Sequence, residues 1–156
     1  KVQVNLTEKG LHAVIVDSIM FASGQADLLP KSQEVLVQVA GVLRETAKAV
    51  VVEGHTDDRP ISTARYPTNW ELSGARAFSV VRFLQGQPST LDPSGYVGIG
   101  HGQYRPVESN DNAAGRAKNR RVEILFSWEQ WQNSNNPPEK TPGPKESLPK
   151  EAARPS

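Results

Sequence analysis

The 156-residue chain contains no cysteine, which excludes disulfide bonds and thiolate metal sites and leaves the cellular compartment undecided. No apolar run approaches the roughly 18 residues of a membrane-spanning helix, and the N-terminus lacks a signal-peptide pattern. The net charge is only +1, so electrostatics gives no reason to expect nucleic acid or a membrane surface as partner. This composition predicts one ordinary globular domain with a tail.

Motifs of common enzymes and metal sites are also missing. The three histidines, at positions 12, 55 and 101, have neither H-x3-H nor H-E-x2-H spacing, so we expect no metal site. No G-x-S-x-G nucleophile elbow occurs. The glycines at 98, 100 and 102 start like a dinucleotide-binding fingerprint, but Pro106 and polar residues follow in place of a helix. We expect no cofactor and no enzymatic activity.

Hydrophobic periodicity predicts alternating strands and helices. Strands are expected at 11–17, 49–53, 96–102 and 121–128, and helices from Pro30 to about Lys48 and from Asn69 to the glycine at 86. The order strand, helix, strand, helix, strand, strand predicts an α/β (α+β) two-layer sandwich, with two helices packed on one face of a mixed sheet.

Composition divides the chain into three parts. Residues 1–10 are predicted to be a polar lead-in linker and residues 11–132 the folded domain. Half of the twelve prolines lie in 133–156, where Leu148 is the only larger aliphatic residue. Such a segment cannot offset its own ordering entropy, so we expect a disordered, proline-rich tail.

The helix from Asn69 carries a start signal and a candidate binding residue. Thr68 and Glu71 have capping-box spacing, and Pro67 disfavours an earlier helical start. Asn69 and Arg76 are seven residues apart, so they lie two turns apart on one face. Spacing alone leaves open whether Arg76 is a binding residue or a solvated helix arginine.

Asp57 is the second candidate. It lies just past the carboxyl end of the 49–53 strand, where α/β sheets usually bind ligands, and Gly54 lets the backbone turn sharply there. Position alone equally suits a turn-forming or helix-capping aspartate.

Two motifs decide between these alternatives. The spacing N-x2-L-S-x2-R-A-x2-V-x3-L, from Asn69 to Leu84, and G-H-T-D at 54–57 resemble the signature of OmpA-like peptidoglycan-binding domains. The resemblance covers about residues 11–128 and implies a β-α-β-α-β-β fold. It also implies that Asp57 and Arg76 bind the free end of diaminopimelate in the peptide stem of the cell wall.

The ligand chemistry suits this assignment. Diaminopimelate presents an ammonium and a carboxylate on one carbon. The Asp57 carboxylate can accept from the ammonium, and the planar Arg76 guanidinium can bind the carboxylate through two parallel hydrogen bonds. We expect both groups to line a cleft that solvent reaches.

The resemblance extends the site to further residues. Thr56 and Asn69 could add hydrogen bonds, Leu72 belongs to the signature, and the loop 21–27 is expected to form a wall through backbone groups. Arg120, in the N-R-R segment at 119–121, is either a ligand contact or a basic strand start that packs over the sheet.

The loop at 58–73 resembles a narrower group, the stator proteins of flagellar motors (MotB), through Asp58-Arg59-Pro60-Ile61 and Tyr66-Pro67-Thr68-Asn69-Trp70-Glu71-Leu72-Ser73. This resemblance implies a periplasmic homodimer that anchors a stator to peptidoglycan, alongside a MotA-like membrane subunit. We expect the membrane helix to lie outside these residues. The alternatives are an OmpA- or Pal-like module that tethers the outer membrane to the wall, and a wall hydrolase, which the missing catalytic motifs disfavour.

Overall fold

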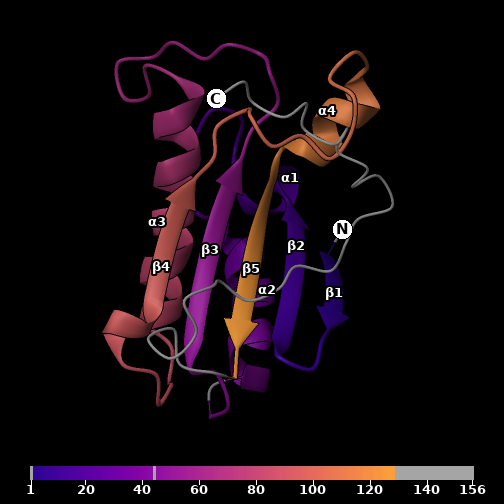
Figure 1. Ribbon diagram of the computed structural model, residues 1–156. Coiled ribbons are helices and arrows are strands. Elements are labelled where there is room, and N and C mark those ends of the chain that lie inside the picture. The colour runs from indigo at the N-terminus through magenta and orange to yellow at the C-terminus, as the bar shows by residue number, and fades with distance from the viewer. Residues whose placement is uncertain (1, 44, 129–156) are drawn as a thin grey trace, which may run out of the picture.

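The computed structural model describes residues 2–43 and 45–128. Five strands form one sheet in the order β1-β2-β5-β3-β4 (Figure 1). Their bounds are β1 Val2–Leu6, β2 Gly10–Val16, β3 Ala49–His55, β4 Tyr96–Gly100 and β5 Arg121–Ser127. Strands β3 and β4 are parallel and the other neighbours are antiparallel, so the sheet is mixed, as the sequence predicts.

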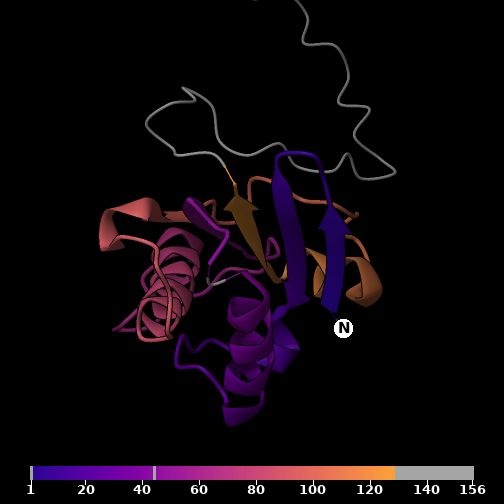
Figure 2. The same ribbon diagram turned by 90° about the horizontal axis from the view of Figure 1, so that it is seen from below.

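The two long helices cover one face of this sheet (Figures 1 and 2). The helical segments are α1 Asp17–Met20, α2 Pro30–Leu43, α3 Asn69–Gln85, the 3₁₀ turn η1 Pro93–Gly95 and α4 Ala113–Asn119. Alternate strand residues such as Ile15, Val52 and Ile124 pack with Leu36 and Val80 of the helices into one core that solvent does not reach. The predicted two-layer sandwich is confirmed. In the described part of the chain, no helix has the length and hydrophobicity to cross a bilayer.

The lead-in prediction for residues 1–10 is wrong for β1. This strand pairs antiparallel with β2, with Val4 opposite Ala13. It is an edge strand whose backbone ladder holds it in place while Val4 and Leu6 stay exposed. The sequence does carry a signal for it, since Val2, Val4 and Leu6 alternate with polar residues as in a strand. The predicted domain end at 132 and the tail at 133–156 lie outside the described residues.

Helix α3 begins where the capping-box spacing predicts. The Thr68 hydroxyl accepts from the Trp70 N–H at 3.1 Å, and the Glu71 carboxylate accepts from the Thr68 N–H at 2.9 Å. These bonds satisfy N–H groups that the first turn would otherwise leave unpaired. They fix the residue at which α3 starts and therefore the direction of Arg76 two turns later.

The backbones of β3 and α3 approach each other directly at Gly54. A Cβ atom built on Gly54 would lie 2.1 Å from the carbonyl oxygen of Ser73. Only glycine allows this approach, which brings α3 down onto the sheet just before the loop that carries Asp57.

Removing the cap tests its contribution. Thr68→Ala is expected to lower the free energy of unfolding by about 1 kcal/mol, because the first turn loses its side-chain acceptor. Urea unfolding followed by circular dichroism measures this. Ser62→Ala, at an exposed loop position nearby, is the control and should change stability by less than about 0.5 kcal/mol. Equal effects of the two changes would contradict a specific role for the cap.

Candidate functional site

Four charged side chains meet at the carboxyl end of β3, the upper end of the sheet in Figure 1. They come from four different places in the fold: the residue after β2, the loop after β3, the third turn of α3 and the residue before β5. We call this set the charge quartet: Asp17, Asp57, Arg76 and Arg120.

The strand register explains why these residues converge. Val16 lies opposite Arg121 in the β2–β5 ladder, and His55 lies opposite Arg121 in the β3–β5 ladder. Asp17, which follows β2, and Arg120, which precedes β5, therefore lie at the same end of the sheet as the loop after β3. The Asp17 N–H donates to the Arg120 carbonyl at 2.9 Å.

Within the quartet, negative and positive groups alternate. Arg76 Nη1 donates to Asp17 Oδ2 at 3.1 Å, Arg120 Nε lies 3.5 Å from Asp17 Oδ1, and Arg120 Nη1 donates to Asp57 Oδ2 at 2.7 Å. The other Asp57 oxygen accepts from the Arg59 N–H at 2.9 Å. Each carboxylate therefore has at least two donors, which is how buried charges are normally accommodated.

One expectation about this site is corrected. Asp57 and Arg76 do not line an open cleft, since only 6% of Asp57 and 3% of Arg76 is exposed. Asp17 and Arg120 lie between them, so they make no direct pair among the described contacts. The side chain that solvent reaches is Arg120, at 36%. The alternative of a solvated Arg76 is wrong as well.

The loop before α2 encloses Arg76 through its backbone carbonyls, while its role as a wall of a ligand pocket stays a prediction. Arg76 Nε donates to the Gln25 carbonyl at 2.8 Å and Nη2 to the Ala22 carbonyl at 3.4 Å, and the guanidinium lies 4.8 Å from the centre of the Phe21 ring. A guanidinium has five N–H donors, and these two bonds with the one to Asp17 use three of them within the described structure. The other two donors have no partner among the described hydrogen bonds.

Burial and ion pairing act differently on the two arginines. Burial lowers the pKa of Arg76 from its ordinary value, although the Asp17 charge opposes this shift. Burial also lowers the pKa of Arg120, but the hydrogen bond to Asp57 and the charge of Asp17 outweigh it and raise that pKa overall. Both guanidiniums remain cationic at neutral pH.

Asn69 connects the loops around the quartet. Its side-chain amide donates to the Arg59 carbonyl at 3.0 Å and to Gln103 Oε1 at 3.1 Å, and it lies 3.4 Å from the Asp57 carbonyl. The amide therefore holds the Asp57 loop against the loop that follows β4. A direct bond from Asn69 to a ligand stays a prediction.

Thr56 and Leu72 also have structural surroundings. The Thr56 hydroxyl donates to the Asp57 carbonyl at 2.8 Å, and Leu72 is buried with Ala26 and Tyr66 in a small cluster apart from the main core. Leu72 thereby ties the loop before α2 to the loop before α3. Ligand contact by either residue stays a prediction.

Asp17 is the quartet member that the sequence motifs do not identify. Its signal is positional: it ends the predicted 11–17 strand, as Arg120 precedes the predicted 121–128 strand. Antiparallel pairing of those two strands would place the residues together, but which strands are neighbours cannot be read from one sequence.

The comparison with protein families agrees with this architecture. The model described as OmpA family matches residues 20–120. The chain belongs to the OmpA family. The match contains Asp57, Arg76 and Arg120, while Asp17 precedes it.

Named members and structures resemble the chain over most of its length. Motility protein B of Bacillus subtilis is 36% identical over 127 residues, which are 81% of this chain and 48% of the relative. Peptidoglycan-binding protein ArfA of Mycobacterium bovis is 35% identical over 121 residues, 77% of this chain and 35% of the relative. The solved cell wall anchor of the T6SS from Pseudomonas aeruginosa has a TM-score of 0.76 and 39% identity, and the match covers 82% of this chain and 88% of that chain.

These similarities confirm an OmpA-family domain of the MotB type. The chain spans about half the length of Motility protein B and about a third of the length of ArfA.

Proposed function

We propose that the domain binds the peptide stem of peptidoglycan at the charge quartet and anchors a flagellar motor stator to the cell wall. The observation that carries this proposal is the quartet itself. Two carboxylates and two guanidiniums meet at the carboxyl end of β3, and the Arg120 side chain is open to solvent. Support comes from the OmpA family and from relatives named for motility, peptidoglycan binding and cell wall anchoring.

The quartet suits a ligand with an ammonium and a carboxylate on one carbon, as in diaminopimelate. The ammonium would bind the Asp57 carboxylate in place of the Arg120 guanidinium. The carboxylate would then be shared by Arg120 and the two remaining donors of Arg76. Each contact is a charge-assisted hydrogen bond, the strongest kind available to such a ligand.

We infer binding without catalysis. The hydroxyl beside Asp57 belongs to Thr56 and donates to a backbone carbonyl, so it is not held by a base that could activate it. The carboxylates of the quartet are each bound by an arginine, which suits them as hydrogen-bond acceptors.

The wider role rests on the same proposal. A stator anchor of this type would act in the periplasm as a homodimer, with a MotA-like membrane subunit joined through other parts of a longer protein. Two quartets on one dimer would gain avidity on a polymeric wall. The alternative is an OmpA- or Pal-like tether between outer membrane and wall, and the similarity to a T6SS anchor shows that related domains serve machines other than flagella. A transmembrane helix or a lipid-anchor cysteine in the full-length gene would distinguish these roles.

Asp57→Asn is the direct test of wall binding. The change keeps the size of the side chain and one of the two acceptor oxygens that bond the Arg59 N–H and Arg120 in the parent protein, but removes the charge that attracts the ammonium. Loss of one charge-assisted bond, about 1.5–3 kcal/mol, should weaken co-sedimentation with insoluble peptidoglycan roughly tenfold or more. Asp58→Asn, which removes an exposed neighbouring charge, is the matched control and should bind like the parent protein. Equal binding by both variants would remove Asp57 from the site.

A further inference from the structure

A second group of charged and polar side chains lies on the opposite face of the sheet from α2 and α3. Glu53 of β3 and Glu123 of β5 lie directly opposite each other in the ladder, and each is 5% exposed. Two like charges opposite each other in a sheet are destabilising, more so when buried. Cationic or hydrogen-bonding groups are therefore needed around them.

The surroundings of the two carboxylates differ. Glu123 accepts from Arg121 at 2.8 Å, and its other oxygen lies 2.7 Å from His12 Nε2. Glu53 faces two imidazoles: its Oε2 lies 2.5 Å from His101 Nε2 and 3.9 Å from His55 Nε2. His55 Nε2 also lies 3.3 Å from Glu123 Oε2, so this ring stands between the two carboxylates. Together with His101 it supplies the nitrogen donors that transition metals prefer.

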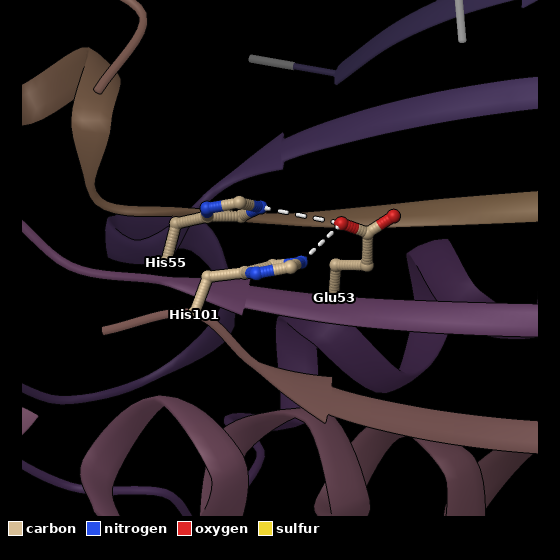
Figure 3. A group of neighbouring side chains, drawn as sticks. All are labelled: Glu53, His55 and His101. Carbon is tan, nitrogen blue, oxygen red and sulfur yellow. Dashed lines mark hydrogen bonds and ion pairs between the residues drawn. The ribbon is translucent and has the colours of Figure 1, made fainter. Parts of the chain in front are cut away.

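Figure 3 shows how these side chains converge. Glu53 and His55 are two residues apart on β3 and so share a face, and His101 follows β4 alongside them. The rings of His55 and His101 are stacked with centres 4.8 Å apart, and their Nε2 atoms point toward the Glu53 carboxylate. One ligand atom from each of the three lies within 4.8 Å of the others.

We propose that Glu53, His55 and His101 form a binding site for a divalent transition metal ion of the zinc class. Zinc in tetrahedral sites takes imidazole nitrogen at about 2.0–2.1 Å and carboxylate oxygen at about 2.0–2.2 Å. Such bonds place neighbouring donors about 3.3 Å apart. Glu123 Oε2, 3.3 Å from His55 Nε2, offers a fourth donor, and the distances from Glu53 lie on either side of the required spacing.

Binding needs a small rearrangement. The ring planes differ by only 20°, so the two Nε2 lone pairs are nearly parallel and one ring must turn for both to meet a single ion. His101 is suited to this, because its side chain is 17% exposed while that of His55 is 1% exposed. The ion would replace the proton between His101 and Glu53. Arg121 and His12, which contact the Glu123 carboxylate, would fix its orientation.

The donor set also indicates the class of metal. Calcium and magnesium prefer oxygen ligands alone, whereas two imidazoles with carboxylates favour zinc and its neighbours. Helical zinc motifs place histidines four residues apart, so spacing rules of that kind do not detect a site built across strands. The proposal is independent of wall binding, since none of its residues belongs to the charge quartet.

Titration calorimetry with zinc chloride on the metal-stripped 156-residue protein tests the site. We expect one ion per chain and a rise in melting temperature on binding. Cobalt(II) should give the intense visible absorption of a tetrahedral site. His101→Gln should weaken zinc binding at least about tenfold, and Glu53→Gln should do likewise.

Glu34→Gln is the matched control for Glu53→Gln, because it removes an exposed carboxylate on α2, outside the cluster, and should keep one ion per chain. Binding far below one equivalent in the parent protein would overturn the proposal and leave a hydrogen-bonded cluster. Equal affinity in the parent and in a folded His101→Gln variant would overturn it too. If His101→Gln does not fold, the cobalt spectrum of the parent protein decides the outcome.

Discussion

Replacing Arg76 by alanine is expected to lower the free energy of unfolding by about 3–5 kcal/mol, the range seen when one partner of a buried ion pair is removed. Arg76 is 3% exposed and bonds Asp17 and the carbonyls of Ala22 and Gln25. Its loss removes a donor from the carbonyls of Ala22 and Gln25 and leaves Asp17 with Arg120 alone as its side-chain partner among the described contacts. Urea unfolding measures the change.

Arg82→Ala is the matched control for this experiment. Arg82 lies on the same helix and is exposed, so its loss should alter stability by less than about 0.5 kcal/mol. Asp17→Asn should be less harmful in the Arg76→Ala background than in the parent protein, because the two residues share one interaction. Unchanged stability of Arg76→Ala would mean that packing alone positions the loop before α2.

Arg76→Ala also bears on wall binding, but it cannot test that function alone. Because the change is expected to destabilise the fold, a loss of binding would have two explanations. Asp57→Asn separates them, since it leaves the buried Arg76–Asp17 pair intact and keeps one acceptor oxygen at position 57, so the fold should be largely kept.

Gly54→Ala is expected to have the second large effect, a loss of about 3 kcal/mol or more. The added Cβ would lie 2.1 Å from the Ser73 carbonyl oxygen and 2.9 Å from its carbon. Those atoms belong to the backbone of α3, so relief requires moving the helix rather than turning a side chain. Overpacking of a core usually costs about 1–3 kcal/mol, and this contact is at the severe end.

Gly41→Ala is the opposite case and serves as control. It lies within α2, and a Cβ there meets nothing within 4 Å. Alanine should therefore stabilise the domain by about 0.5–1 kcal/mol through its better helix propensity. Thermal melting of both variants compares them. A Gly54→Ala protein that melts like the parent would show that α3 can withdraw from the sheet without loss.

Local signals in the sequence predicted local structure well. The Thr68–Glu71 spacing placed the start of α3 correctly, and Pro30 is the first residue of α2. These features depend on residues within one turn of each other, so the necessary information is contiguous. Trp70 shows the limit of periodicity: spacing of seven residues puts it in line with the buried Ala77 and Leu84 on α3, but it is 51% exposed and stacks on Tyr104.

The partners within the site could not be predicted in the same way. Asp57 and Arg76 were identifiable from motifs, whereas Asp17 and Arg120 intervene because of the neighbour relations of β2, β5 and β3. The histidine and glutamate cluster likewise depends on cross-strand register. A single sequence gives the faces of strands but not their order in a sheet, and it is the order that determines which charges meet.

The alternation of charge in the quartet has a consequence for the choice of ligand. Two aspartates and two arginines sum to zero, so a ligand with a net charge would leave one group in this buried site unmatched. An amino acid end group is itself zwitterionic. Its ammonium can take the place of Arg120 beside Asp57 while its carboxylate pairs with the released Arg120, so no charge is left without a partner. Amidation of its carboxyl group would break that balance, because the displaced Arg120 would then face a neutral amide. In the proposed binding mode the domain should therefore distinguish amidated from free stem peptides by their net charge more than by their shape.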